Sequence, residues 1–163
     1  MKKNVVKRML SIVAAASMLC MPLAVSAEGF DEAGAVVDGS TLTIHDFVED
    51  EKLVVMRGAH LAKGTSRITN LGNRTVGVGG DTTCHVNCDT VICRLYLEQK
   101  DSEGYWNNYD SWNYSTTNDH GLLVSTTKKV AGQHWYRVKG SHIAILNNKI
   151  ESTTTATDGI WIS

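Results

Sequence analysis

The sequence has almost no proline and no sustained helical periodicity. Its one proline, Pro22, lies close to the N-terminus, so no later strand is excluded by a residue that cannot donate a backbone hydrogen bond. After residue 27, no long stretch repeats its apolar side chains at the period of an amphipathic helix. These two absences argue against a helical domain and favour β-structure.

Long hydrophobic runs are also missing, apart from one at the N-terminus. That run follows the cationic segment MKKNVVKR, contains Pro22 and ends in the small residues VSA at 25–27. We therefore predict that residues 1–27 are a signal peptide, cleaved after residue 27, and that the chain is secreted with no membrane segment left. A lipoprotein signal at Cys20 is the alternative, and Leu19 argues against it because a small residue is needed there.

Lysine and arginine are absent from residues 28–51, which hold eight Asp and Glu residues. From residue 52 onward there are 12 cations against nine acids. We predict an acidic N-terminal arm at 28–51 and one domain at 52–163. The arm is interpreted as solvated and partly disordered, and the alternative is an arm that docks on the basic body. The small, unclustered positive surplus gives no indication of nucleic-acid binding.

Short alternating runs of apolar and polar residues recur along the chain. They are rich in Val, Ile, Thr, Tyr and Trp and are separated by Gly, Asn and Asp, which is typical of strands joined by turns. The predicted strands span 41–47, 52–57, 66–70, 75–79, 90–99, 106–114, 122–129, 133–145 and 159–162. Their spacing predicts an all-β fold, a single antiparallel β-sandwich of roughly eight strands.

Cysteine is sparse, and its count after the predicted cleavage site is odd. Cys84, Cys88 and Cys93 remain, so at least one thiol is free or pairs between molecules. Cys93 alternates with apolar residues and is expected to be buried in a strand. Cys84 and Cys88 flank the polar turn CHVNC, where export would favour a local disulfide. A metal site is the alternative, but no second ligand pair follows at zinc-like spacing, so no metal is predicted.

Familiar catalytic motifs are absent: the sequence has no GxSxG, HExxH or phosphate-binding loop. Among the six histidines, His142 stands out because it and Glu151 flank a turn at 147–148 and are expected to face each other across a hairpin. Such a pair is structural more often than catalytic. Asp110 and Asp119 fall at exposed hairpin positions and do not form the buried carboxylate pair of a glycosidase. We predict no enzyme activity and no cofactor.

Aromatic residues are few overall but crowd into EGYWNNYDSWNYSTTN, residues 103–118. In a regular strand, Trp106 and Trp112 would share one face and Tyr109 would lie on the other. Trp112 is expected in the core. Tyr105, Trp106 and Tyr109 are candidate ligand-binding residues, because exposed rings stack on sugars while neighbouring amides bond the hydroxyls. The alternative is aromatic pairing that only stabilises the hairpin.

Several segments in the later part of the chain form an ordered pattern: VVMRGAHLAKGTSRITNLG, VGVGGDTT, LYLEQKDSEGYWNNYDSW, KKVAGQHWYRVKGSHIAI and IESTTTATDGIWI. This pattern, over about residues 53–162, resembles a family of small secreted proteins of unknown function from clostridia-like Gram-positive bacteria. The resemblance implies a secreted, β-rich single domain and supplies no activity. In that family pattern the hairpin tryptophan recurs at Trp112, which implies a core role, whereas Cys84 and Cys88 are not part of it.

Three functions are compatible with these features. The first is a non-catalytic module that binds a glycan or another cell-surface ligand through the aromatic stretch. The second is a secreted interaction or inhibitor protein that binds another protein, for which the small domain, the CHVNC turn and the acidic arm are the indications. The third, with the least support, is an exported hydrolase, which would need a deep pocket with a buried histidine or acid.

Overall fold

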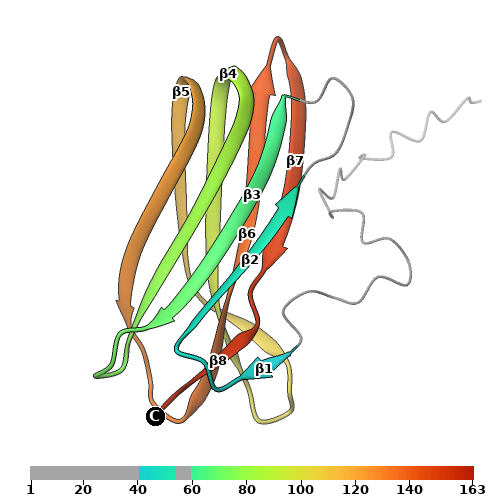
Figure 1. Cartoon of the computed structure of the whole chain (residues 1–163). Coiled ribbons are helices and arrows are strands. Elements are labelled where there is room, and N and C mark those ends of the chain that lie inside the picture. The colour runs from blue at the N-terminus through green and yellow to red at the C-terminus, as the bar shows by residue number, and fades with distance from the viewer. Residues whose placement is uncertain (1–40, 54–59) are drawn as a thin grey trace, which may run out of the picture.

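The computed structural model describes residues 41–53 and 60–163, and these residues form strands and turns without any helix (Figure 1). The predicted signal peptide and residues 28–40 of the arm lie outside the described residues. None of the described residues belongs to a helix that could span a membrane. The strands are β1 (Leu42–Thr43), β2 (Phe47–Leu53), β3 (Leu61–Asn70), β4 (Thr75–Lys100), β5 (Trp106–Lys129), β6 (His134–Leu146), β7 (Lys149–Ala156) and β8 (Gly159–Ile162).

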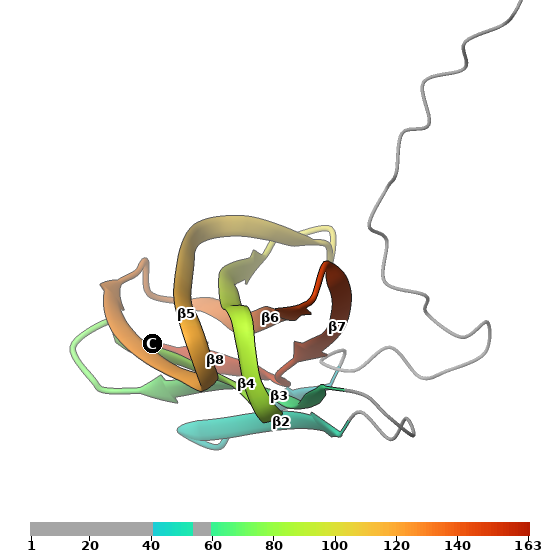
Figure 2. The ribbon, with the colours of Figure 1, turned by 90° about the horizontal axis from the view of Figure 1, so that it is seen from above.

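The eight strands belong to one curled sheet. Its order is β1-β8-β6-β4-β3-β2, with β5 also beside β4 and β7 also beside β6. Neighbouring strands are antiparallel except β1 and β8, which are parallel. Seen from above, β2 and β3 lie on one side and β6 on the other, while β4 and β5 pass from one side to the other (Figure 2).

The sheet curls because its two longest strands bend together. β4 has 26 residues and β5 has 24, and both arch over at one end of the molecule (Figure 1). At the bend the register jumps, since Thr83 pairs with Gly121 but Cys88 pairs with Asp119. Asn118 of β5 has a left-handed φ of 51°, a conformation that asparagine tolerates better than most residues. The first half of β4 then pairs with β3 and the second half with β6.

The main core lies between the two halves of the curled sheet. Apolar side chains from β3, β4, β6 and β8 meet there, and Trp112 packs against them, so its predicted core role is confirmed. Gly80 lets the halves of β4 approach, because a Cβ at this position would lie 2.7 Å from Leu95 Cδ2 and 2.9 Å from Cys93 Sγ. A second cluster fills the bent end and consists of Leu61, Cys84, Cys88, Val91 and Ala144.

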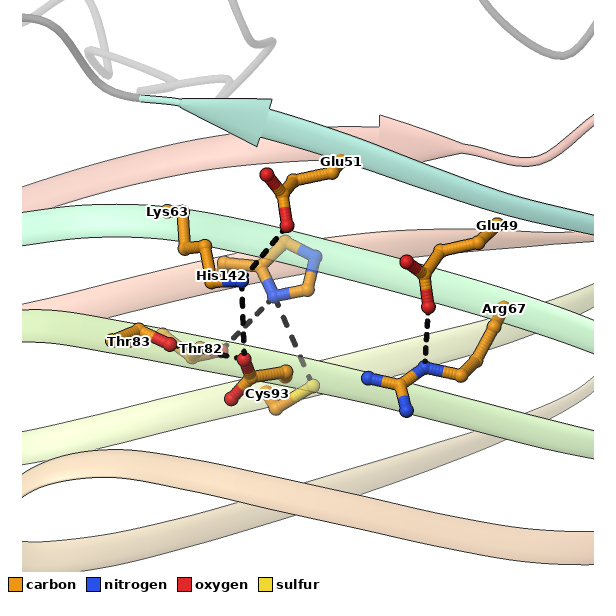
Figure 3. A network of polar contacts seen from close by, with 9 residues as sticks. Glu49, Glu51, Lys63, Arg67, Thr82, Thr83, Cys93 and His142 are labelled. Carbon is orange, nitrogen blue, oxygen red and sulfur yellow. Dashed lines mark hydrogen bonds and ion pairs between the residues drawn. The ribbon is translucent and has the colours of Figure 1, made fainter.

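The acidic segment enters the sheet as β2. Glu49 and Glu51 alternate along β2 and face the cations of β3, with Arg67 Nε 3.1 Å from Glu49 Oε2 and Lys63 Nζ donating to Glu51 Oε2 at 2.8 Å (Figure 3). On the other side of β2, Asp50 accepts a hydrogen bond from the Ala156 backbone N–H at 2.8 Å. The boundary predicted between residues 51 and 52 therefore falls inside β2, where residues 47–51 of the arm pair with β3 while Glu49 and Glu51 stay exposed.

The all-β prediction is confirmed, but the topology differs from the predicted sandwich of separate sheets. Hydrogen bonding continues through β4 and β5 around the bend, so one sheet supplies both sides of the core. The sequence predicted separate strands at 75–79 and 90–99 and again at 106–114 and 122–129. In the structure, each of these pairs belongs to a single long strand.

Candidate binding face

A β-bulge at Tyr109 decides how the aromatic stretch is distributed. Leu97 of β4 pairs with Asp110, whereas the next residue, Glu98, pairs with Asn108, so Tyr109 is an extra residue. A bulge shifts the alternation of side chains along a strand. Trp106 and Trp112 therefore lie on opposite faces of the sheet, and the prediction that they share a face is wrong.

Trp106 lies on the outer face, where neighbouring side chains hold it. The Arg137 guanidinium carbon is 4.5 Å from the centroid of the indole ring, and Lys100 Nζ is 5.7 Å away. Arg137 is itself buried and paired with Glu98, with Nε 2.6 Å from Oε2. The far edge of the ring rests on Gly159, where a Cβ would come within 2.8 Å of Trp106. The ring is thus fixed in position and half-buried.

The two tyrosines of the predicted set are placed differently. Tyr105 precedes β5 in the turn and is 67% exposed. Tyr109 is 38% exposed, and its ring meets Tyr136 edge-to-face at a centroid distance of 5.5 Å. Tyr136 is fully buried, so Tyr109 covers the core from the side opposite to Trp106. The structure does not join the three predicted residues into one aromatic platform.

An open hollow lies on the outer face of β4 and β5. It has a volume of about 300 Å³ and is lined by Arg94, Tyr96, Ser111, Trp112 and Asn113. Strand geometry groups Arg94, Tyr96, Ser111 and Asn113, because residues two apart on a strand share a face and directly paired residues lie side by side. Trp112 lies between Ser111 and Asn113 on β5, and its side chain packs against the core. Arg94 pairs with Asn113 and Tyr96 pairs with Ser111, while the intervening Leu95 points into the core.

β6 extends this face on the other side of β4. Ser141 pairs with Arg94 and Lys139 pairs with Tyr96. Each row across the three strands thus has a central residue from β4 with polar neighbours on both sides. We call the set Trp106, Arg94, Tyr96, Ser111, Asn113, Lys139 and Ser141 the outer β4–β6 face. Only Trp106 of this set was predicted from the sequence; the period-two pattern of RLYLEQ would have indicated that Arg94 and Tyr96 share a face.

The interior holds a second polar arrangement, centred on His142 of β6 (Figure 3). The side chain is fully buried, and both ring nitrogens have partners: Nδ1 lies 3.0 Å from Thr82 Oγ1, and Nε2 lies 2.9 Å from Thr155 Oγ1. Space for the ring comes from Gly64 and Gly140, since a Cβ at either position would overlap the imidazole. Burial lowers the pKa of His142 to about 4, so the ring is neutral at neutral pH.

The hydroxyl groups around His142 fix its tautomer. The Thr82 hydroxyl donates its only proton to the Ile92 carbonyl at 3.1 Å, so its oxygen accepts a hydrogen bond from Nδ1–H. Nε2 then accepts from the Thr155 hydroxyl, whose oxygen accepts from the Ser66 hydroxyl at 2.5 Å. Both ring nitrogens of His142 therefore have a hydrogen-bond partner when the ring is neutral.

The predicted contact between His142 and Glu151 is wrong. In the β6–β7 hairpin His142 pairs with Thr153, and Glu151 pairs with Ala144, two residues farther along. Glu151 instead approaches His60, with 3.2 Å between Oε1 and Nδ1, and accepts a hydrogen bond from the Leu61 backbone N–H at 2.8 Å. In this register Glu151 lies opposite Ala144, so it is two residues along the strand from the position opposite His142.

The described histidines near thiols are not arranged as catalytic pairs. His60 Nε2 faces the Ala144 carbonyl at 3.0 Å, which leaves neither ring nitrogen directed at a cysteine. Cys93 Sγ lies 3.9 Å from His142 Nδ1, but burial raises the pKa of Cys93 to about 11. A nucleophilic cysteine needs the opposite shift, toward a thiolate beside an imidazolium.

All three cysteines of the domain are free thiols and buried. The predicted burial of Cys93 is confirmed. The predicted Cys84–Cys88 disulfide is not seen; both side chains instead enter the cluster at the bent end. Burial, followed by the hydrogen bond with Cys88, raises the pKa of Cys84 to about 12. The two thiols are therefore neighbours, and the disulfide stays a prediction.

Comparison with known proteins gives a family without an assigned function. The sequence matches a family of unknown function, DUF6147, over residues 23–160. No curated protein and no solved structure matches the chain. The resemblance to a family of unknown function is thereby confirmed, and the match extends farther toward the N-terminus than the pattern at 53–162 predicted.

Proposed function

We propose a function for a chain that belongs to DUF6147, a family of unknown function: it is a secreted, non-catalytic module that binds a glycan or another cell-surface polymer on the outer β4–β6 face. Export is supported by the cationic start, apolar run and small-residue cleavage site of residues 1–27. Because the structure is one curled sheet rather than the predicted sandwich, we place the ligand on the outer side of this sheet.

The observation that carries the proposal is the hollow at Arg94 and Tyr96. It joins an aromatic ring to amide, hydroxyl and guanidinium donors, which together suit the apolar faces and the hydroxyls of a sugar. Trp106 lies on the same face toward the end of β4, because it pairs with Lys100. Two rings on one face, separated along the strand, suit an extended polymer better than a small enclosed substrate.

Binding to polysaccharides tests this proposal directly. The purified protein is titrated with a panel of soluble oligosaccharides while its tryptophan fluorescence is recorded, and retention on insoluble cell-wall polymers is measured in parallel. Tyr96→Ala and Trp106→Ala are each expected to weaken binding about tenfold, which corresponds to the ~1.4 kcal/mol that one ring contact can contribute.

The matched control is Phe47→Ala, which removes an exposed ring from β2, on the other side of the curled sheet. It is expected to bind like the unaltered protein. If no polymer gives saturable binding, the proposal is refuted. If Tyr105→Ala and Tyr109→Ala abolish binding while Tyr96→Ala does not, the ligand occupies the turn and the bulge instead of the outer β4–β6 face.

A secreted interaction protein is the second candidate, and the edge of β5 favours it. Among the described residues β5 pairs only with β4, so one edge of this 24-residue strand has no neighbour. Such an edge is a site at which another chain can add a strand. Amide hydrogen exchange with and without a candidate partner tests this: protection confined to β5 supports strand addition, and protection elsewhere contradicts it.

A further inference from the structure

We infer that the ligand of the outer β4–β6 face is an anionic saccharide, whose carboxylate or sulfate lies against Arg94 while its sugar ring lies against Tyr96. This inference rests on the proposed function and specifies its ligand class. It follows from the position of Arg94 in the hollow, from the polar groups beside it and from the charge balance of the face.

Arg94 occupies the centre of one row of the face. Asn113 lies beside it on β5 and Ser141 on β6, so an amide and a hydroxyl flank the guanidinium. The planar guanidinium donates two parallel hydrogen bonds to a carboxylate or a sulfate, a geometry that lysine does not offer. Paired residues on neighbouring strands lie about 5 Å apart, so both flanking groups are within reach of an oxyanion bound to Arg94.

Tyr96 occupies the centre of the next row, two residues farther along β4. Ser111 lies on one side and Lys139 on the other. Along a strand, residues two apart are separated by about 7 Å, which one charged sugar residue can bridge with its ring on tyrosine and its oxyanion on arginine. Lys139 is exposed and adds a second positive charge at the rim of the hollow.

The charge balance separates this face from the rest of the sheet. No described acidic residue forms an ion pair with Arg94 or Lys139, and Glu98, the nearest acid along β4, is bound to Arg137. On the opposite outer face, Lys63 and Arg67 are paired with Glu51 and Glu49. The cations of that face are thus paired within the protein, whereas Arg94 has no acidic partner among the described residues.

A matched pair of ligands tests the inference. An oligogalacturonate and its methyl ester have the same sugar rings, and they differ only at the carboxyl group, which is charged in the acid and a neutral methyl ester in the other. The acid is expected to bind at least tenfold more tightly than the ester. A sulfated oligosaccharide and its desulfated form make a second pair, which shows whether the oxyanion that Arg94 accepts is carboxylate, sulfate or either.

Substitutions assign the effect to individual residues. Arg94→Gln is expected to weaken binding of the acid more than tenfold and to leave binding of the ester unchanged, because only the charged contact is lost. Arg94→Lys is expected to recover only part of the affinity, since the bidentate geometry is missing. Lys139→Gln should have a smaller effect. Lys63→Gln, on the opposite outer face, is the control and should change nothing.

The outcomes distinguish the inference from the proposed function. Equal binding of acid and ester, or an Arg94→Gln variant that binds the acid normally, overturns the anionic ligand and leaves the glycan-binding module standing. Binding of neither form in any ligand pair refutes both. Added salt should weaken binding of the acid and leave the ester unaffected, because the charged contact lies at the surface and is screened.

Discussion

The stability of the protein should fall in mild acid because of His142. The imidazole is fully buried and its hydrogen bonds are complete only in the neutral form. Protonation would place a second N–H on Nε2, where the Thr155 hydroxyl now donates. Burial lowers the pKa from 6.5 to about 4 in the folded state, whereas the unfolded chain keeps the ordinary value.

The sign and magnitude follow from proton linkage. Above about pH 6.5 the ring is neutral in both states, so it adds no pH dependence. Between about pH 6.5 and about pH 4 the unfolded state binds a proton that the folded state does not, and the free energy of unfolding decreases. Each unit of pKa difference corresponds to about 1.4 kcal/mol, so the total loss is about 3 kcal/mol.

The residues around His142 add no second titration in this pH range. The groups that face the ring come from four strands and include one titratable side chain, Cys93, which stays neutral because its pKa is raised to about 11. The facing residues are Gly64 and Ser66 of β3, Thr82 and Cys93 of β4, Gly140 of β6 and Thr155 of β7.

Urea unfolding across this pH range is the assay, with His142→Gln as the comparison. The variant should be less stable at neutral pH, by about 2–4 kcal/mol for the lost buried contacts. This difference should shrink by about 3 kcal/mol as the pH falls to about 4, because only the unaltered protein loses the histidine contribution. His120→Gln, an exposed histidine, controls for general titration. Parallel stability curves for His142→Gln and the unaltered protein would refute the reasoning.

Four further substitutions or modifications test the packing and hydrogen bonding. Gly140→Ala should lower the free energy of unfolding by about 3 kcal/mol, because its Cβ would overlap His142 and Thr155. Gly72→Ala, at a φ of 77° with no atom within 4 Å, should cost only about 1–2 kcal/mol; equal losses in chemical unfolding would contradict the packing argument. In the native protein, Cys93 should resist alkylation at about pH 8 and react after denaturation, as mass spectrometry can show, because it is buried and its pKa is raised to about 11. Tyr136→Phe should cost about 1–2 kcal/mol through lost bonds to Gln99 and Ala131, and an unchanged unfolding midpoint would show that these bonds contribute nothing.

The strands could be predicted because alternation is a local property. Val91, Cys93, Leu95 and Leu97 lie at every second position and are all buried, as their spacing indicated. Their continuity could not be predicted. CHVNC and the residues near Asn118 have the composition of turns, but in the structure they form a coordinated bend in two paired strands. Whether such residues end a strand or bend it depends on the neighbouring strand, which local composition does not contain.

The candidate site depends even more on strand pairing, which the sequence does not show. Trp106 was predicted to share a face with Trp112, and one extra residue at Tyr109 reversed this. A bulge needs no glycine or proline, so the sequence carries no sign of it. The role of Arg94 could not be predicted from the sequence, because it depends on which acidic residues the neighbouring strands bring close to it. Only the structure shows that Glu98 is paired with Arg137 and that β5 and β6 place an amide and a hydroxyl beside Arg94.

The polar contacts of the described residues are the reason that we propose binding on the outer β4–β6 face. His142 and His60, the most buried histidines, have both ring nitrogens engaged by the fold. The pKa values of Cys84 and Cys93 are raised by burial, which disfavours thiolates. On the outer β4–β6 face, Arg94 lies in one row and Tyr96 and Lys139 lie in the next. Neighbouring strands place these groups at the regular spacing of a sheet, which would suit the repeating units of a polymer, and this is why ligand binding is the first activity to test.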